Sequence, residues 1–92
     1  MLFIHIHKHS TDKCLTGKSQ ELINIGNSVQ EEAKKVGVKI IGVYAAPHQH
    51  TIFSIYEADD IAKLERVLTP MTLWGDSQLI PVVSMQLPTA GT

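Results

Sequence analysis

The sequence has a single cysteine, Cys14, among its 92 residues. One cysteine cannot form an intramolecular disulfide, so the fold must be stable without one. The chain also lacks any apolar run close to the roughly 20 residues that a transmembrane helix needs. Its apolar start, residues 1–6, is too short for a signal peptide and already contains a histidine. These absences predict a soluble cytoplasmic protein with no membrane partner.

Neither sign of charge dominates, because 8 basic residues stand against 9 acidic ones and the net charge is −1 at pH 7. Proteins that bind nucleic acid or anionic membranes through phosphate contacts carry a basic surplus. The charge balance therefore argues against nucleic acid as the main partner. Aromatic residues are also few, and we interpret Tyr44, Tyr56 and Trp74 as core or interface packing.

Hydrophobic residues make up 43% of the chain, which suits one small domain with a modest core. We expect residues 1–87 to form this domain. The Pro, Thr, Ala and Gly composition of residues 88–92 predicts a loosely held tail.

Alternating or β-branched runs predict the strands of this domain. They are residues 2–8, 38–46, 51–56 and 79–87. A short polar turn joins the second and third runs, which predicts an antiparallel hairpin. Before the last strand, Trp74 and Gly75 indicate a loop. Gly42, inside the second strand, indicates a bulge or close packing.

Apolar residues three and four apart predict a helix from residue 20, with Ser19 as its N-cap and Gly37 at its end. Asp59 or Asp60 can cap a second helix that ends near Pro70. The element order is then βαββαβ. It predicts an α+β, ferredoxin-like fold with a four-stranded antiparallel sheet and both helices on one face.

The face of such a sheet that no helix covers is normally polar in a monomer. Here both alternating sets of residues are largely apolar in runs 38–46 and 79–87. A large apolar surface on a soluble protein usually marks an interface. Two such sheets packed face to face predict a homodimer or a higher homo-oligomer.

The whole chain resembles members of the dimeric α/β-barrel superfamily, which includes muconolactone isomerases, small quinone-forming monooxygenases and haem-degrading monooxygenases. The segments HTIFSIYEADDIAKLERVL and LIPVV are most similar to small ferredoxin-like proteins of that kind, among them nickel-binding ones. The resemblance implies a dimeric α/β barrel and, for an enzyme, isomerisation or cofactor-independent oxygenation. It transfers no catalytic residue to this chain, because it depends on element order and hydrophobic pattern.

The histidines are concentrated in two groups. His5, His7 and His9 alternate along the first strand, so their side chains lie on one face, and His48 and His50 repeat this spacing just before the third strand. In the ferredoxin-like topology the end of the first strand lies beside the start of the third. We assign the even residues of the first strand to the helix-packed core, which sends the histidines to the uncovered face.

These residues predict a transition-metal site. His5 and His9 lie roughly 13 Å apart in a regular strand, so both cannot bind one ion. We expect His7 with His5 or His9, completed by His48 or His50, with Cys14 as a further candidate ligand. Imidazole suits zinc, nickel, copper and iron, although an iron site with a carboxylate ligand would have to recruit one from elsewhere. A register shift of one residue between the strands would separate the two groups.

Two other functions remain open from the sequence. The chain can be a dimeric-barrel enzyme, of the isomerase or small monooxygenase type, in which His7 or His50 acts as general acid or base on a small organic molecule. It can also be a structural module whose apolar sheet face only makes an oligomer.

Overall fold

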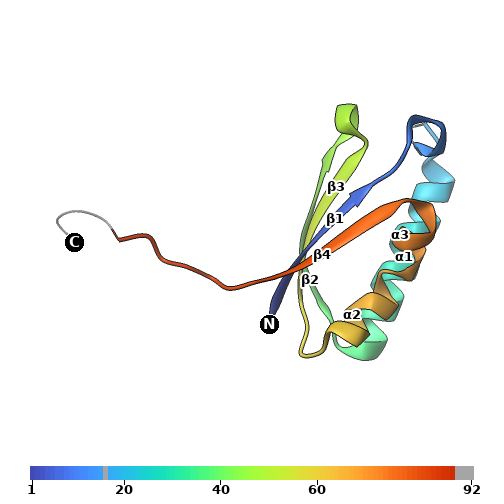
Figure 1. Ribbon diagram of the computed structural model, residues 1–92. Helices are drawn as coiled ribbons and strands as arrows, with labels where there is room; N and C mark the ends of the chain where they lie inside the picture. The colour runs from blue at the N-terminus through green and yellow to red at the C-terminus, as the bar shows by residue number, and fades with distance from the viewer. Residues whose placement is uncertain (16, 89–92) are drawn as a thin grey trace.

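The computed structural model describes residues 1–15 and 17–88. Four strands and three α-helices make up most of this part of the chain (Figure 1). In chain order the elements are β1 (Leu2–Lys8), the 3-10 turn η1 (Thr11–Lys13), α1 (Ser19–Val36), β2 (Lys39–Ala46), the 3-10 turn η2 (Pro47–Gln49), β3 (Thr51–Glu57), α2 (Ile61–Val67), α3 (Thr69–Trp74) and β4 (Asp76–Val82).

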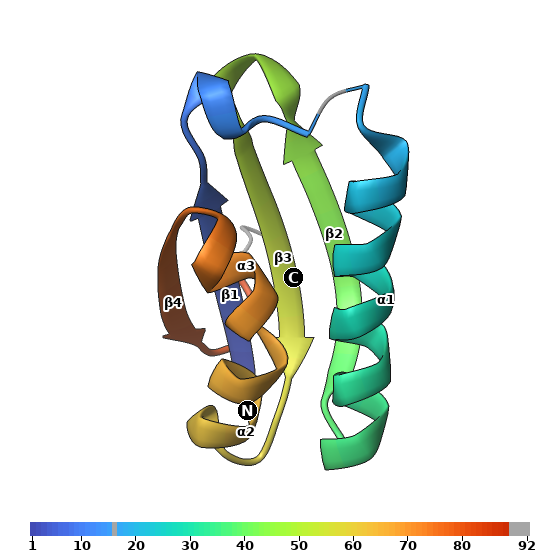
Figure 2. The same ribbon diagram turned by 90° about the vertical axis from the view of Figure 1, so that its right-hand side faces the viewer.

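The four strands form one sheet in the order β2-β3-β1-β4, and each neighbouring pair is antiparallel. All three helices lie on one face of this sheet, with α1 beside α2 and α3 (Figures 1 and 2). The predicted ferredoxin-like α+β fold is therefore confirmed. The predicted bulge in β2 is also present, since the β2–β3 register shifts between Ile40 and Gly42.

The first helix ends where the sequence predicts. Gly37 follows Val36 in the left-handed conformation, at φ 79°, and its N–H donates to the carbonyl of Ala33. Glycine adopts this conformation without the steric penalty of a Cβ, so it stops the helix cheaply. At the other end the prediction is off by one residue, because Ser19 is already helical and Lys18 is the N-cap.

The second helical region is longer than predicted. Asp60 caps α2 as expected, since its carboxylate accepts a hydrogen bond from the N–H of Ala62 at 2.9 Å. The predicted loop around Trp74 is wrong, because a further helix, α3, occupies this segment. Pro70 lies in the first turn of α3, where its missing N–H costs no helical hydrogen bond. The proline thus begins a helix as well as ending one.

The last strand begins three residues before its predicted start and stops at Val82. β4 pairs only with β1, and the final pair is Leu2 with Val82. Because β1 starts at Leu2, residues 83–88 have no neighbouring strand among the described residues. Residues 83–88 instead run away from the body of the molecule as an extended segment (Figure 1). Residues 89–92 of the predicted loose tail lie outside the described part of the chain.

The core lies between the sheet and the helices. Leu64 and Val67 of α2 are fully buried there, together with Phe3 of β1 and Tyr56 of β3. Phe3 pairs with Tyr56 across the β1–β3 ladder, so both side chains lie on the helix-covered face. Since side chains alternate along a strand, every residue of β1 that shares the parity of Phe3 also faces the helices.

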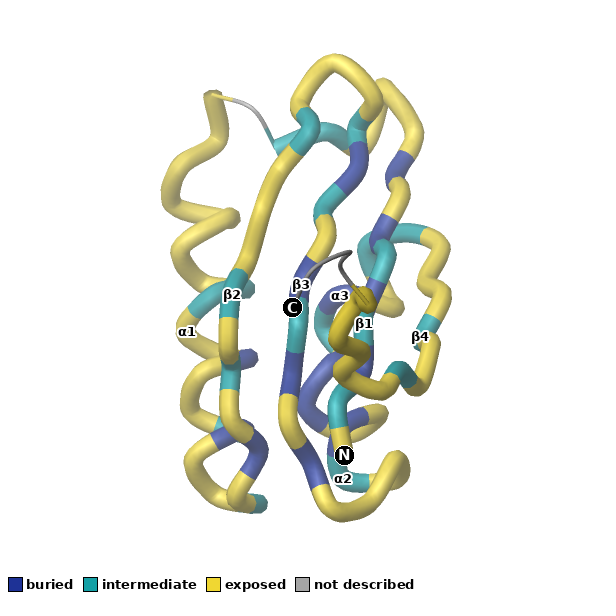
Figure 3. Tube along the Cα trace, turned by 90° about the vertical axis from the view of Figure 1, so that its left-hand side faces the viewer, coloured by how far each residue is buried: buried dark blue, intermediate teal, exposed yellow. Residues whose placement is uncertain are grey.

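The opposite face of the sheet has no helix over it (Figure 1). Tyr44, Phe53 and Ile6 follow one another across β2, β3 and β1 on this face, because the register pairs them in turn. Tyr44 and Phe53 are 63% and 40% exposed, and Ile80 of β4 is also exposed. Viewed from this side, much of the chain is exposed at β2 and β4 (Figure 3). None of the helices described here is long and apolar enough to cross a membrane.

Candidate metal centre

The histidines of β1 point toward the helices, and the expected assignment to the uncovered face is wrong. His5, His7 and His9 are 1%, 0% and 8% exposed, and they share the parity of buried Phe3. Ile4 and Ile6 lie on the other face, although they were expected in the helix-packed core. The ring of Phe3 fills the space beneath the helices. Because the histidines have the same parity as Phe3, their side chains lie on the same face.

The expected meeting of the first and third strands is present. Lys8 pairs with Thr51 at the end of the β1–β3 ladder, and the N–H of His9 donates to the carbonyl of His50 at 3.1 Å. The two imidazole rings then lie 5.5 Å apart in an edge arrangement. The register therefore brings His9 and His50 together on one face.

His50 reaches this position through an unusual backbone conformation. It follows η2 at φ 51° and ψ 42°, in the left-handed region, and its N–H donates to the carbonyl of Pro47 at 3.1 Å. Residues other than glycine adopt this backbone conformation at a cost of about 1 kcal/mol or more. His50 is the one non-glycine residue with positive φ within the described ranges. The tight turn turns the imidazole back toward the end of β1.

Cys14 joins these two histidines from the loop after β1. One ligand atom from each of His9, Cys14 and His50 lies within 4.8 Å of the others, so the three residues could hold a metal ion. A tetrahedral ion bound at about 2.0–2.3 Å needs its ligand atoms about 3.3–3.8 Å apart. The three side chains would therefore close by about an ångström around an ion. His9 is buried, and the other two are half-buried.

Trp74, at the end of α3, holds the parts of this site in place. Its ring stacks on His9, with centroids 4.5 Å apart and planes 15° apart, and its centroid lies 4.4 Å from that of His7. Its Nε1–H donates to the carbonyl of Lys13 at 2.7 Å, which ties the residue before Cys14 to the same indole. From the sequence, Trp74 was expected only to pack in the core or at an interface. Its being the single tryptophan of the chain was the only signal for this role.

Gly75 allows this close approach of α3 to β1. A Cβ at this position would lie 2.5 Å from the carbonyl oxygen of Lys8 and 2.9 Å from Cε1 of His7. The backbone of Gly75 is extended, so its conformation suits any residue. The reason for glycine here is the lack of space beside the histidine row.

A hydrogen bond between two imidazoles determines which nitrogen of His9 faces the cluster. Nε2 of His7 lies 3.2 Å from Nδ1 of His9, which leaves Nε2 of His9 as the nitrogen available to a metal. Among the described residues, Nε2 of His9 and Nδ1 of His50 are buried and have no hydrogen-bond partner. Buried polar atoms without partners are costly, and a bound ion would satisfy both.

His7 is suited to accept this hydrogen bond. Burial lowers its pKa to about 4, and the neighbouring charges of His9 and His5 act in the same direction. It is therefore neutral at pH 7, with one nitrogen free to accept. If Nδ1 of His9 donates its proton to Nε2 of His7, the lone pair of His9 lies on Nε2, as a metal ligand requires.

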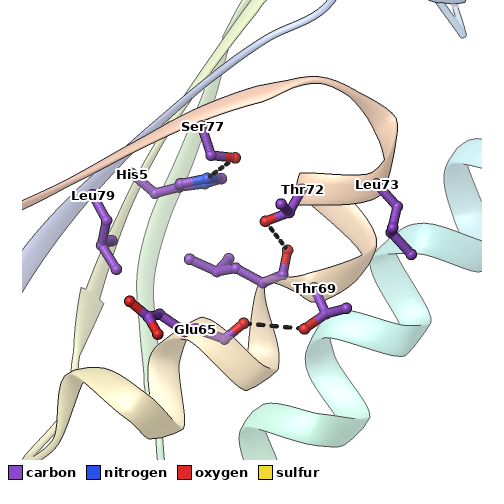
Figure 4. Close-up of a pocket in the computed structure, with 8 residues that line it drawn as sticks. His5, Glu65, Thr69, Thr72, Leu73, Ser77 and Leu79 are labelled. Carbon is purple, nitrogen blue, oxygen red and sulfur yellow. Dashed lines mark hydrogen bonds between the residues drawn. The ribbon is translucent and has the colours of Figure 1, made fainter.

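His5, at the other end of the row, has different neighbours. Its Nε2 lies 2.9 Å from Oγ of Ser77 on β4, and burial lowers its pKa. It lines a separate cavity of about 380 Å³. In Figure 4, His5 lies on the sheet side of this cavity, and Glu65, Thr69 and Thr72 lie on the α2–α3 side. Both threonine hydroxyls there donate to helix carbonyls, of Glu65 and Leu68. His5 does not reach the cluster of His9, Cys14 and His50.

The five predicted histidines thus divide into separate environments. His9 and His50 lie close to Cys14, whereas His7 contacts His9 at Nδ1, away from the nitrogen that faces the cluster. His5 bonds to Ser77, and His48 is exposed on the turn η2. No carboxylate joins the group of three ligands in the part of the chain that the structure describes.

Comparison with known proteins shows the family and the fold, without an activity. A family model described as "Domain of unknown function (DUF3303)" matches residues 1–90. The crystal structure of SCO4226 from Streptomyces coelicolor A3(2) is similar, with a TM-score of 0.62 and 16% sequence identity. The match covers 91% of this chain and 100% of that one, and at this identity it shows the fold alone. No curated protein matches the sequence.

Proposed function

We propose that this chain, which belongs to the DUF3303 family of unknown function, is a small transition-metal-binding protein. The ion is held by Nε2 of His9, the thiolate of Cys14 and Nδ1 of His50. The observation that carries the proposal is the convergence of one ligand atom from each of these three residues, which come from three separate segments, within 4.8 Å.

Two further features support the site. Two buried imidazole nitrogens of the cluster have no hydrogen-bond partner among the described residues, which an ion would supply. With Nδ1 of His9 as the donor, the hydrogen bond between His9 and His7 has the form that metal proteins use to orient an imidazole ligand, in which the nitrogen away from the metal donates to a neighbour.

The ligand set favours particular ions. Two imidazoles and one thiolate suit zinc, nickel or copper, and they disfavour magnesium and calcium, which prefer oxygen ligands. Iron remains a weaker candidate, because the iron sites of oxygenases use a carboxylate beside two histidines. We therefore propose sequestration, delivery or sensing of a borderline or soft metal ion as the function.

The metal content of untagged protein, measured by elemental mass spectrometry after native purification, tests this proposal. We expect about one equivalent of metal per chain in the wild type and in His48→Ala, since His48 is exposed and outside the cluster. His50→Ala should lose stoichiometric metal. Wild-type protein that neither retains nor takes up metal would rule the function out. Equal retention by the two variants would show that the ligands are assigned wrongly.

We also propose that the protein works as a homodimer of the dimeric α/β-barrel type. The uncovered sheet face supports this, because it presents Tyr44, Phe53 and Ile80 to solvent. The extended segment after β4 adds the exposed Val83, Met85 and Leu87. A second copy of the same face would bury these side chains by an aligned packing of the two sheets.

Light scattering tests the dimer. Phe53→Glu places a charge on the uncovered face and should give a monomer, whereas Leu73→Glu should leave the dimer intact. Leu73 is a matched control, because it is 81% exposed on the helix side of the molecule. A wild-type mass equal to that of one chain would overturn this part of the proposal.

A cytoplasmic location also fits the site, since Cys14 must remain a thiol to bind metal.

A further inference from the structure

A cavity of about 200 Å³ opens directly beside the proposed metal ligands. His9, Cys14 and His50 all line it. Most of the remaining wall is apolar, formed by Leu15, Leu22, Ala45, Pro47, Ile52 and Trp74. An engineered apolar cavity of about 150 Å³ holds benzene, so this one is large enough for a small organic molecule.

The protein supplies an incomplete coordination shell. A tetrahedral ion takes four ligands, and sites with three protein ligands leave the fourth position to water or substrate. Within residues 1–15 and 17–88, no further histidine, cysteine, aspartate or glutamate joins the group of three. Because all three ligands line the same cavity, an ion held between them would be accessible from that cavity.

The wall determines what can occupy this position. Thr51, a polar residue of the wall, already donates its hydroxyl to the carbonyl of Gln49 at 2.8 Å. A ligand with several polar groups would place some of them against the apolar wall without hydrogen-bond partners, which costs free energy. The cavity therefore favours a molecule with an apolar body and one polar atom, and that atom must bind the metal.

Charge narrows the choice to an anion. A divalent ion with one thiolate and two neutral imidazoles carries a net charge of +1, which is unfavourable beside an apolar wall. A monoanionic ligand makes the group neutral. Among monoanionic donors, a thiolate suits the same borderline or soft ions that the site prefers.

We propose that the metal-bound protein takes a small apolar thiol in the open position. The thiol binds as its thiolate: a metal–sulfur bond forms, the S–H bond breaks, and the proton passes to solvent, with no change in oxidation state. This inference depends on the proposed function, because without the metal the cavity offers the thiol no partner.

Cobalt(II) spectroscopy with thiophenol tests the inference. The full chain is first loaded with Co²⁺, and its thiolate-to-cobalt charge-transfer band is recorded. Thiophenol should increase this band roughly twofold, as a second Co–S bond joins the one from Cys14. In Ala45→Leu the added side chain narrows the cavity, and the increase should be lost. Ala46→Leu is the matched control, since Ala46 does not line the cavity.

A second probe keeps the test valid if a variant does not fold. The charged thiol 2-mercaptoethanesulfonate, added to wild-type protein, should need at least about tenfold higher concentration of its thiolate form than thiophenol, because its sulfonate would lie against the apolar wall. Equal responses to the two thiols would overturn the inference. So would stoichiometric cobalt binding with no response to thiophenol, or loss of cobalt from the protein on adding it. Failure to bind cobalt at all would instead overturn the metal site itself.

Discussion

The two ends of the β1 histidine row differ in what other elements bring to them. His5 and His9 come from one strand, face the same side and are both buried. At the first end, β4 supplies Ser77, whose hydroxyl lies 2.9 Å from His5. At the other end, two loops supply Cys14 and His50, and Nε2 of His9 is left without a hydrogen-bond partner in the described structure.

This difference teaches that spacing along the strand aligns the imidazoles but does not make them ligands. Nδ1 of His5 is also buried without a hydrogen-bond partner, but within the described residues His5 belongs to no group of side chains that could hold an ion. A buried histidine that meets a thiol and a second imidazole, with a lone pair free, has the donor set of a transition-metal site.

Removing the imidazole at each end should have the largest and most unequal effect. His9→Ala should raise the dissociation constant for Zn²⁺ by more than the roughly 100-fold that loss of an outer-shell partner costs, because a ligand itself is removed. His5→Ala should leave it nearly unchanged. Competition with a chromophoric chelator measures both. If His5→Ala weakens binding as much as His9→Ala, the two ends do not differ as described.

His7 lies between His5 and His9, and its substitution should change metal binding only at the His9 end. His7→Phe keeps a ring next to Trp74 but removes the acceptor for Nδ1 of His9, so Zn²⁺ affinity should fall about 10- to 100-fold. His7→Gln, whose carbonyl oxygen can accept a hydrogen bond, should recover part of this loss. The same substitution at His5, His5→Phe, is the control and should leave affinity unchanged. No difference between His7→Phe and His7→Gln would show that His7 only fills space.

A substitution at Gly75 tests the close packing of α3 against the histidines of β1. Gly75→Ala puts a methyl group where Lys8 and His7 leave no room, and should destabilise the metal-free protein by about 1–3 kcal/mol. Gly26→Ala is the control: it lies within α1 with nothing within 4 Å of its added Cβ, and should stabilise by about 0.5–1 kcal/mol. Urea unfolding measures both changes. Equal shifts of the same sign would contradict the close contact at Gly75.

The element order was predictable because each element has a local signal. Gly37 ends α1 and Asp60 caps α2 through interactions within a few residues of themselves. The end of β4 was not predictable in this way, because the apolar pattern continues past Val82 while the partner strand β1 does not. Propensity marks where a strand is possible, and pairing determines where it ends.

The candidate site was predictable only in part, for the same reason. The proximity of His9 and His50 follows from topology, and Cys14 was named as a further ligand that required the loop to fold back. The face of the histidines could not be inferred from strand alternation alone, because both sets of β1 side chains are apolar enough to pack under helices. The contacts of Trp74 in the site could not be inferred, since its hydrogen bond to Lys13 spans 61 residues of sequence.

In the absence of metal, the stability of the protein should depend on pH through His5 and His7. Burial lowers the pKa of His5, and it lowers the pKa of His7 from 6.5 to about 4. Between these two values the unfolded chain binds protons at His7 that the folded chain does not, so stability falls as pH drops from 6.5 toward 4. Below about 4 both states are protonated at His7, and its contribution stops changing. Urea midpoints of metal-free protein across this range should fall with pH, and less steeply in His7→Phe. A midpoint equally sensitive to pH in His7→Phe would mean that His7 is not the group that titrates, and that the slope arises elsewhere in the fold.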